Sequence, residues 1–186
     1  TISITSYSTN DSSLGSATRT DTNGIITGGH IDLNYYYNNL DFSLNDDSNV
    51  TVSLVTLIHE VLHILGIVDT DSEYYLEETD SSYPSSVVND GDYTNNVWIG
   101  PDALSGYRQV LQANGYDTSN IQYVIIEDDG GSGTQNVHFE ENESILTVDN
   151  IVYPRIPNEI MTGSLGENTY ITPMTTGILK DMGYTI

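Results

Sequence analysis

The feature that most constrains this chain is a nearly continuous apolar segment from Val50 to Leu65, which carries the sequence His59-Glu60-Val61-Leu62-His63. The segment is too long for one strand. Cap-type polar residues precede it and Gly66 follows it, which predicts a buried helix over 50–65. Side chains at positions i and i+4 lie about 40° apart around a helix and about 6 Å apart along it. Both imidazoles can therefore reach one ion from the same face of the helix.

The glutamate between the two histidines adds a chemical function to this pair. Glu60 lies about 100° from His59 around the helix, so it can address the open coordination position of an ion without being a ligand. A bound metal lowers the pKa of water towards about 7, Glu60 takes the proton, and the resulting hydroxide attacks a polarised carbonyl. Three ionisable side chains on a helix otherwise made mainly of Val, Leu and Ile are costly to bury without a purpose. The motif therefore predicts a zinc hydrolase.

The charge of the chain restricts the classes of partner that it can bind. Its 186 residues include 4 Lys and Arg against 27 Asp and Glu, which gives a formal net charge of −23. A phosphate backbone is bound by clustered basic residues, so nucleic acid is excluded as a partner and an anionic membrane surface is disfavoured. No apolar run approaches the roughly 20 residues that span a bilayer. Because cysteine is absent, neither disulfides nor thiolate metal ligands can form.

The length predicts a single domain over 1–186, with an N-terminal subdomain to about 68 and a C-terminal subdomain over 69–186, and we favour a monomer. The patterns indicate an α/β (α+β) chain. Strands are expected at 1–7, 30–35 and 121–126, a loop at 10–23, and proline-initiated helices over 101–115 and 173–183. The chain opens at Thr1 without an initiator Met or a basic-then-apolar leader. We therefore expect a processed chain or an excised domain, with an extracellular location.

A catalytic zinc ion usually takes three protein ligands, and the residues leave two candidates for the third. Asp69 follows His63 closely, and a carboxylate there can bind the ion itself. His138 lies much further along the chain, at the end of a glycine-rich approach over 131–138. The residues by themselves leave both candidates open.

Several motifs taken together resemble a known family. Gly66 stands three residues after His63, as in the metzincin form of the motif, and residues 157–163 look like the methionine-containing turn of metzincins. With the segments 100–115, 131–138 and 171–184, this order resembles the catalytic domain of leishmanolysin-like zinc metallopeptidases, which belong to the metzincin clan. The resemblance extends from about Ile31 to the C-terminus and is most specific at 59–66 and 131–184.

The resemblance implies a metzincin-like fold, with a twisted mixed N-terminal sheet, an active-site helix, and an irregular C-terminal subdomain that holds a Met-turn and a terminal helix. It implies endopeptidase activity on proteins or peptides. The residues it assigns are His59, His63 and His138 as ligands of one zinc ion, Glu60 as general base, Met161 as the turn residue under the site, and Gly29, His30, Ile31 and Asp32 as the strand that pairs with extended substrate. The alternative is a catalytically silent metzincin-fold domain that serves adhesion or binding.

Two acidic segments are candidates for calcium. Asp69, Asp71 and Glu73 alternate, and an acidic turn runs over 128–131. An EF-hand loop beginning at Asp69 would need glycine at its sixth position and glutamate at its twelfth, where this chain has Tyr74 and Asp80. A solvated acidic loop is therefore the favoured interpretation.

Overall fold

The computed structural model describes the following residues: 1–10, 13–34, 36, 52–77, 80–83, 96–127, 131, 133–140, 146–148, 151–156, 158–165 and 169–186. They divide into two compact units, the first formed by 1–67 with 165–169 and the second by 68–164 with 170–186. The predicted organisation as one domain stays a prediction. Helices and small sheets alternate along the chain, so the predicted mixed α and β class is confirmed and is consistent with a metzincin-like fold.

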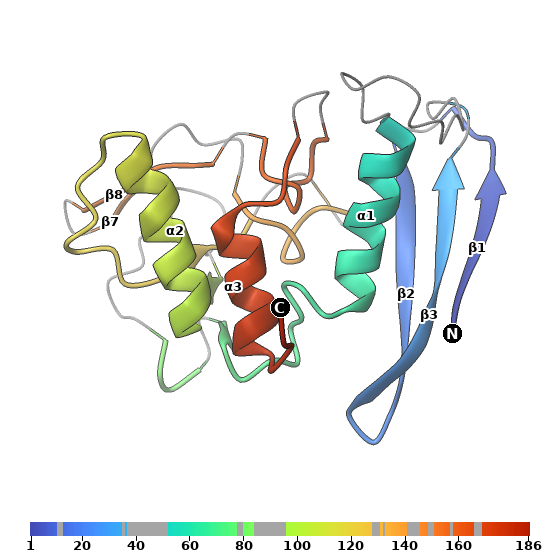
Figure 1. Cartoon of the computed structure of the whole chain (residues 1–186), viewed down its shortest axis with the longest axis horizontal. Coiled ribbons are helices and arrows are strands. Elements are labelled where there is room, and N and C mark those ends of the chain that lie inside the picture. Colours follow the sequence, from blue (N-terminus) through green and yellow to red (C-terminus); the bar gives the residue numbers. More distant parts are fainter. Residues whose placement is uncertain are drawn as a thin grey trace. The chain divides into compact units, whose positions relative to one another are not determined.

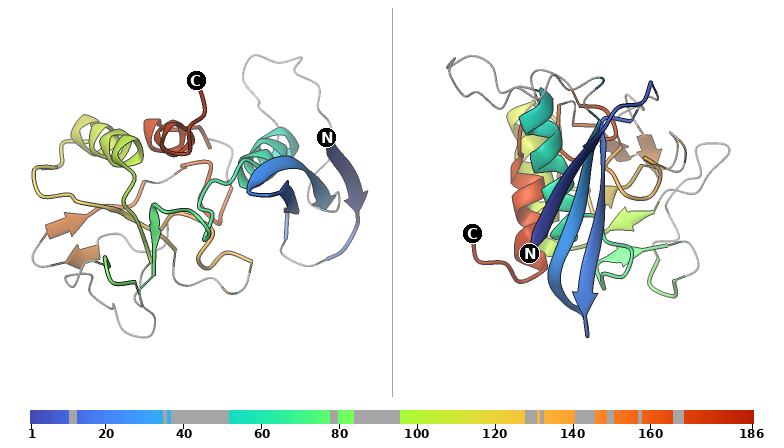
Figure 2. Two further views of the ribbon diagram at one scale, coloured as in Figure 1. Left: turned by 90° about the horizontal axis from the view of Figure 1, so that it is seen from below. Right: turned by 90° about the vertical axis from the view of Figure 1, so that its right-hand side faces the viewer.

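The first unit contains a three-stranded mixed sheet, which is shown edge-on in the right panel of Figure 2. Its strands are β1 (Ile2–Tyr7), β2 (Gly15–Thr22) and β3 (Ile25–Asn34), in the order β1-β3-β2. Strand β1 runs parallel to β3, and β2 runs antiparallel to it. The predicted strands at 1–7 and 30–35 are therefore present, and the second of them begins earlier than expected.

The predicted loop over 10–23 is wrong, because β2 occupies most of it. Asn23 and Gly24 have φ of 56° and 74°, which is the left-handed backbone of a two-residue hairpin turn between β2 and β3. The Ser, Thr and Asp residues of β2 resemble a loop in composition, but alternate residues of the strand are exposed. An Asn-Gly dipeptide between two alternating segments is a hairpin signal that outweighs this composition.

One helix packs on this sheet. Helix α1 (Val52–Ile64) lies alongside β2 and β3 (Figure 1) and confirms the helix predicted over 50–65. Ile64 joins Ile31 and Leu33 in a buried cluster, with Leu57 and Val61 packed against it. These helix residues recur at the spacing of one helical face, so the sheet covers that face and His59 and His63 project from another.

The second unit is built from short strands and two helices. Strands β4 (Tyr75–Leu76), β5 (Val97–Trp98) and β6 (Val124–Ile125) form one antiparallel sheet, and β7 (Leu146–Val148) pairs with β8 (Ile151–Tyr153). The strand predicted over 121–126 is thus present only in its last part. The predicted proline-initiated helices are confirmed as α2 (Pro101–Ala113) and α3 (Pro173–Asp181).

The two helices of this unit pack against each other at glycines, and the left panel of Figure 2 shows them side by side. A Cβ at Gly106 would lie 2.1 Å from the carbonyl oxygen of Pro173, and one at Gly177 would lie 2.4 Å from that of Asp102. Such distances are too short for any side chain, so both positions require glycine.

A carboxylate at the end of α3 caps the N-terminus of α2. Gly100, the N-cap residue of α2, supplies no side-chain hydrogen bond. The carboxylate of Asp181 instead accepts the backbone N–H groups of Asp102 at 2.8 Å and Ala103 at 3.0 Å, and the indole N–H of Trp98 at 3.3 Å. A negative charge at a helix N-terminus is stabilising because the free N–H groups there carry partial positive charge.

Within the described part of the chain, no helix combines the length and the apolar character that crossing a membrane requires.

Candidate metal centre

The chain leaves α1 directly after the second histidine of the motif. Gly66 has a φ of 92°; its N–H donates to the carbonyl of His63 at 2.9 Å, and the N–H of Ile67 donates to that of Leu62 at 3.1 Å. This pair of hydrogen bonds is a Schellman motif, which needs a left-handed residue at the position of Gly66. Gly66 therefore ends the helix just after His63 and fixes the last turn, which carries that histidine.

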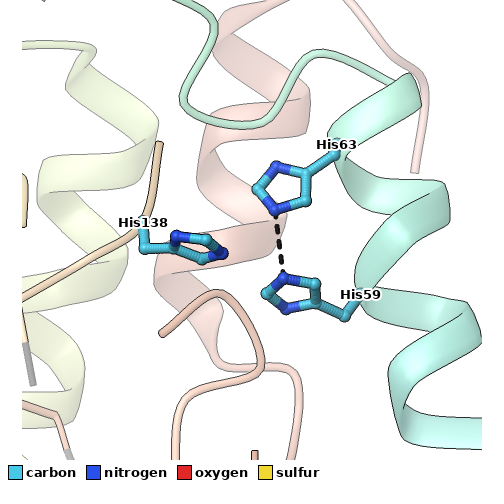
Figure 3. Close-up of side chains that lie close together, drawn as sticks. All are labelled: His59, His63 and His138. Atoms are coloured by element: carbon cyan, nitrogen blue, oxygen red, sulfur yellow. Dashed lines mark hydrogen bonds between the residues drawn. The ribbon is translucent and has the colours of Figure 1, made fainter. Parts of the chain in front are cut away.

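The two histidines of α1 face each other. Their Nε2 atoms lie 3.0 Å apart, and the ring centroids lie 4.6 Å apart in an edge-to-face arrangement (Figure 3). Two nitrogens bound to one tetrahedral zinc ion at 2.0–2.1 Å would be about 3.3 Å apart. The observed separation is close to this value, so the pair fits a single ion that both nitrogens ligate.

Glu60 is buried on the same helix. Only 5% of its surface is exposed, and burial raises the pKa of its carboxyl group to about 7. Its Oε1 atom lies beside Gly15 at the start of β2, where an added Cβ would be 2.9 Å away. A carboxyl group with a pKa near the operating pH is suited to taking up and returning a proton.

His138 is held by the backbone of its own segment. Its Nδ1 lies 2.9 Å from the carbonyl oxygen of Thr134, and because a carbonyl only accepts, Nδ1 carries the proton. Nε2 is then left with the lone pair that a metal ion requires. Burial lowers the pKa of His138, and the hydrogen bond to Thr134 partly offsets this, so the ring favours its neutral, metal-binding form.

Three histidines form the one group of potential metal ligands found among the described residues. A ligand atom each from His59, His63 and His138 lies within 4.8 Å of the other two (Figure 3). Neutral imidazole nitrogens suit zinc, so the donor set fits the predicted ion, and it could hold a metal. Asp69, the alternative third ligand, is not in this group; its carboxylate accepts the N–H of Asp71 at 3.1 Å.

Met161 lies in a tight, fully buried turn. The N–H of Thr162 donates to the carbonyl of Glu159 at 3.3 Å, and the Thr162 hydroxyl donates to the same carbonyl at 2.9 Å. The residue before the turn, Asn158, has a φ of 65°. The turn itself is thus present, and the place of Met161 beneath an ion stays a prediction. Pro157, and the acidic residues 128–130 considered for calcium, lie outside the described residues.

The predicted substrate-pairing strand needs correction. Gly29, His30, Ile31 and Asp32 lie in β3, the central strand, and pair with β1 on one side and β2 on the other. Their backbone groups are committed to these neighbours, so this strand offers no edge to an extended peptide. Among the described strands, the outer positions of the sheet belong to β1 and β2, and it is β2 that passes Glu60.

His30 and Asp32 take part in a polar network on the sheet. His30 Nδ1 lies 2.7 Å from the Ser3 hydroxyl, and its Nε2 lies 3.2 Å from the Asp32 carboxylate. About two fifths of each of the His30 and Asp32 side chains is exposed, at 39% and 40%. Both side chains alternate with the buried Ile31 and Leu33, so they lie on the face of the sheet turned away from α1.

Sequence reasoning missed two residues that contact predicted site residues. Gly15 borders the carboxylate of Glu60, and Glu159 anchors the turn of Met161. The Asn23-Gly24 turn signal could have placed Gly15 on a strand. The contact between Gly15 and Glu60 on α1 arises only from tertiary packing, which the sequence does not reveal. No sequence signal indicated that Glu159 is buried, because an acidic residue in a loop is expected to be solvated.

A methyl group at Gly15 should displace Glu60. In Gly15→Ala the Cβ would meet Glu60 Oε1 at 2.9 Å, the Thr56 methyl at 3.1 Å and the carbonyl oxygen of Asp32 at 3.2 Å. We expect any peptidase kcat to fall by about 10-fold or more, because small displacements of a reacting group are costly. Zinc content should not change. Steady-state kinetics beside Ser16→Ala, an exposed neighbour on the same strand, would check this; an unchanged kcat in Gly15→Ala would contradict it.

Comparison with known proteins adds one finding. The family model described as leishmanolysin matches residues 35–186, a range that contains all three histidines, Glu60 and the Met161 turn. No curated protein matches the sequence.

Proposed function

Because this chain belongs to the leishmanolysin family of peptidases, we propose that it is a zinc-dependent endopeptidase that hydrolyses protein or peptide substrates. The observation that carries the proposal is the group of His59, His63 and His138, with Glu60 buried on the same helix as the first two. A purely structural zinc site is closed by four protein ligands and has no use for a general base. Three nitrogens and a carboxyl group of raised pKa favour a catalytic site.

In this proposal each histidine has a defined protonation state. His138 donates its Nδ1 proton to Thr134 and keeps Nε2 for the ion. His59 and His63 each contribute Nε2, the atoms that lie 3.0 Å apart. Two unprotonated nitrogens at this distance repel each other through their lone pairs. A cation that accepts both lone pairs removes this repulsion. We infer that metal binding displaces the proton the pair otherwise shares.

Glu60 performs the proton transfers. When bound, zinc would acidify the attacking water and polarise the scissile carbonyl. Glu60 accepts the proton of that water and later delivers it to the leaving amine, so the same carboxyl group acts first as base and then as acid. The burial that raises its pKa makes the carboxylate a stronger base and so favours the first transfer, the uptake of the proton from water. A nearby cation lowers this pKa and restores the anionic form that the first transfer needs.

A second candidate is a binding domain of the same family that has lost its activity. The intact Glu60 argues against this candidate, because binding alone would not preserve a buried carboxyl group next to two ligands. An extracellular location also remains our proposal, supported by the strongly acidic chain, and secretion of the native protein into the medium would test it.

Removal and return of zinc tests the proposed function. We expect a chelator to reduce cleavage of casein or a quenched fluorescent peptide by at least about 100-fold, and one equivalent of zinc per chain to restore it. Calcium at the same concentration serves as the control ion, because it prefers oxygen ligands. A protein that takes up one zinc ion but cleaves no substrate would support the binding domain instead.

A further inference from the structure

A buried carboxylate lies at the start of the turn that carries Met161. Glu159 is 0% exposed, and its Oε1 accepts the backbone N–H of Met161 at 3.3 Å and the hydroxyl of Thr175. Its Oε2 accepts the backbone N–H of Thr172 at 3.1 Å. Thr172 is the N-cap of α3 and Thr175 lies in the first turn of that helix. One carboxylate therefore joins the Met161 turn to the start of α3.

Burying the Glu159 carboxylate costs desolvation free energy, which an apolar residue of the same size would not. Desolvation raises the pKa of Glu159, and the hydrogen bonds from Thr172, Thr175 and Met161 offset part of that rise. The position at a helix N-terminus also favours negative charge. An apolar side chain could fill the same volume without desolvating a charge. The carboxylate instead provides directional hydrogen bonds, which fix three donors of the Met161 turn and the start of α3 in one geometry.

The Met161 turn also holds the segment that contains His138. The carbonyl of Met161 accepts the N–H of Phe139 at 2.8 Å, and Phe139 forms a parallel bridge with Thr162. Phe139 directly follows His138, whose own carbonyl accepts the N–H of Glu127 at 3.0 Å. The backbone around His138 is thus fixed from two sides, and the turn supplies one of them.

We propose that Glu159 is a positioning residue, which locks the Met161 turn onto α3 and, through the hydrogen bond between Met161 and Phe139, holds His138 in the orientation in which it ligates the ion. Glu159 acts through the backbone and takes no part in the chemistry. The proposal rests on the proposed function, because it assumes that His138 binds a metal.

Glu159→Gln tests this role with almost no change of shape. Each carboxylate oxygen accepts a backbone N–H, from Met161 on one side and Thr172 on the other. Whichever way the amide is turned, its NH₂ group must face one of these donors, and a backbone N–H cannot rotate away. One of the two segments is therefore released. We expect zinc to dissociate about 10-fold faster, within the range that removal of a residue supporting a metal ligand produces.

Asp181→Asn is the matched control. Asp181 lies at the other end of α3, and its two oxygens also accept three donors, those of Trp98, Asp102 and Ala103. The substitution is again a carboxylate-to-amide change that leaves a donor facing a donor, but it loosens α2 and not the Met161 turn. Because Asp181 is partly exposed and Glu159 is buried, Asp181→Asn should lose less free energy of unfolding, and only Glu159→Gln should lose zinc faster.

Three measurements on each variant decide the matter. The zinc release rate into excess chelator is compared with the free energy of unfolding of each metal-free variant, and hydrogen exchange of the Phe139 amide is followed in the same metal-free proteins. We expect both zinc release and Phe139 exchange to accelerate in Glu159→Gln alone. Equal acceleration in Asp181→Asn, or none in Glu159→Gln, would overturn the positioning role and leave a merely structural one.

A milder pair covers the case in which Glu159→Gln does not fold. Thr175→Val removes one donor to the carboxylate and Thr175→Ser keeps it. Faster zinc release in the valine variant, with wild-type release in the serine variant, supports the proposal; identical release in both contradicts it. Failure of the wild type to bind zinc would refute the proposed function itself, and the Phe139 exchange would still show whether Glu159 holds the turn.

Discussion

Glu60→Gln is expected to lower kcat/KM for peptide hydrolysis by roughly 100- to 10,000-fold, the contribution typical of general acid–base catalysis. Glutamine has nearly the same shape as glutamate and cannot accept the proton of the attacking water. Because Glu60 is not a ligand in our account, the variant should still bind one equivalent of zinc. Kinetics and metal analysis on the same preparation check both statements, and residual cleavage equal to that of the wild type would remove Glu60 from the mechanism.

The same substitution should stabilise the metal-free protein, which separates lost chemistry from lost folding. Burial raises the pKa of Glu60 from 4.5 to about 7, so between these pH values the folded chain binds more protons than the unfolded chain. The free energy of unfolding therefore falls as the pH rises through this window, and the full cost, roughly 3 kcal/mol, is present above about pH 7. Glutamine carries no such cost.

Urea denaturation of metal-free wild type and Glu60→Gln at pH 4.5 and pH 8 measures this effect. We expect the variant to be more stable at pH 8 by up to about 3 kcal/mol and the difference to shrink as the pH is lowered. A difference independent of pH would mean that Glu60 is not destabilised by its burial. Chelator must be present throughout, because a bound cation lowers the pKa of Glu60 and removes the effect.

His138→Ala is expected to abolish stable zinc binding, with a loss of affinity above about 100-fold. Even residues that only orient a metal ligand cost 10- to 100-fold when they are removed, and the loss of a ligand should exceed that. Asp69→Asn is the matched test of the alternative ligand. Asparagine can still accept the N–H of Asp71, which the Asp69 carboxylate accepts at 3.1 Å, so the turn is preserved while the charge is lost.

Titration with zinc in competition with a chromophoric chelator gives both affinities. We expect wild-type zinc affinity in Asp69→Asn and a much lower zinc affinity in His138→Ala. The reverse pattern would assign the third ligand to Asp69. His138→Ala should remain folded, because the Phe139 N–H and the Met161 carbonyl that secure this segment belong to the backbone.

The active-site helix could be predicted because its signals are local. The apolar run, the i and i+4 spacing of the histidines and the glycine after them lie within one short segment, and α1 ends in the Schellman motif that Gly66 makes possible. The proline-initiated helices α2 and α3 were predictable for the same reason. His138 was different, because nothing near it in the sequence indicates a ligand beyond its place in the family pattern.

The order of the strands could not be read from the sequence. Residues 29–32 alternate like an edge strand, yet the hairpin at Asn23-Gly24 and the parallel strand β1 cover both sides of β3. Strand alternation reports which face is buried and carries no information on which edge is paired. Glu159 was hidden for a related reason: its burial depends on α3, which follows it in sequence, folding back over the turn.

The most direct test of the central claim is an anomalous-scattering map, recorded at the zinc absorption edge from crystals of the zinc-loaded protein. We predict one ion bound by nitrogens of His59, His63 and His138 at about 2.0–2.1 Å, with Glu60 near its open position and outside the ligand set. An ion coordinated by Asp69 in place of His138, or no zinc at α1, would contradict the account.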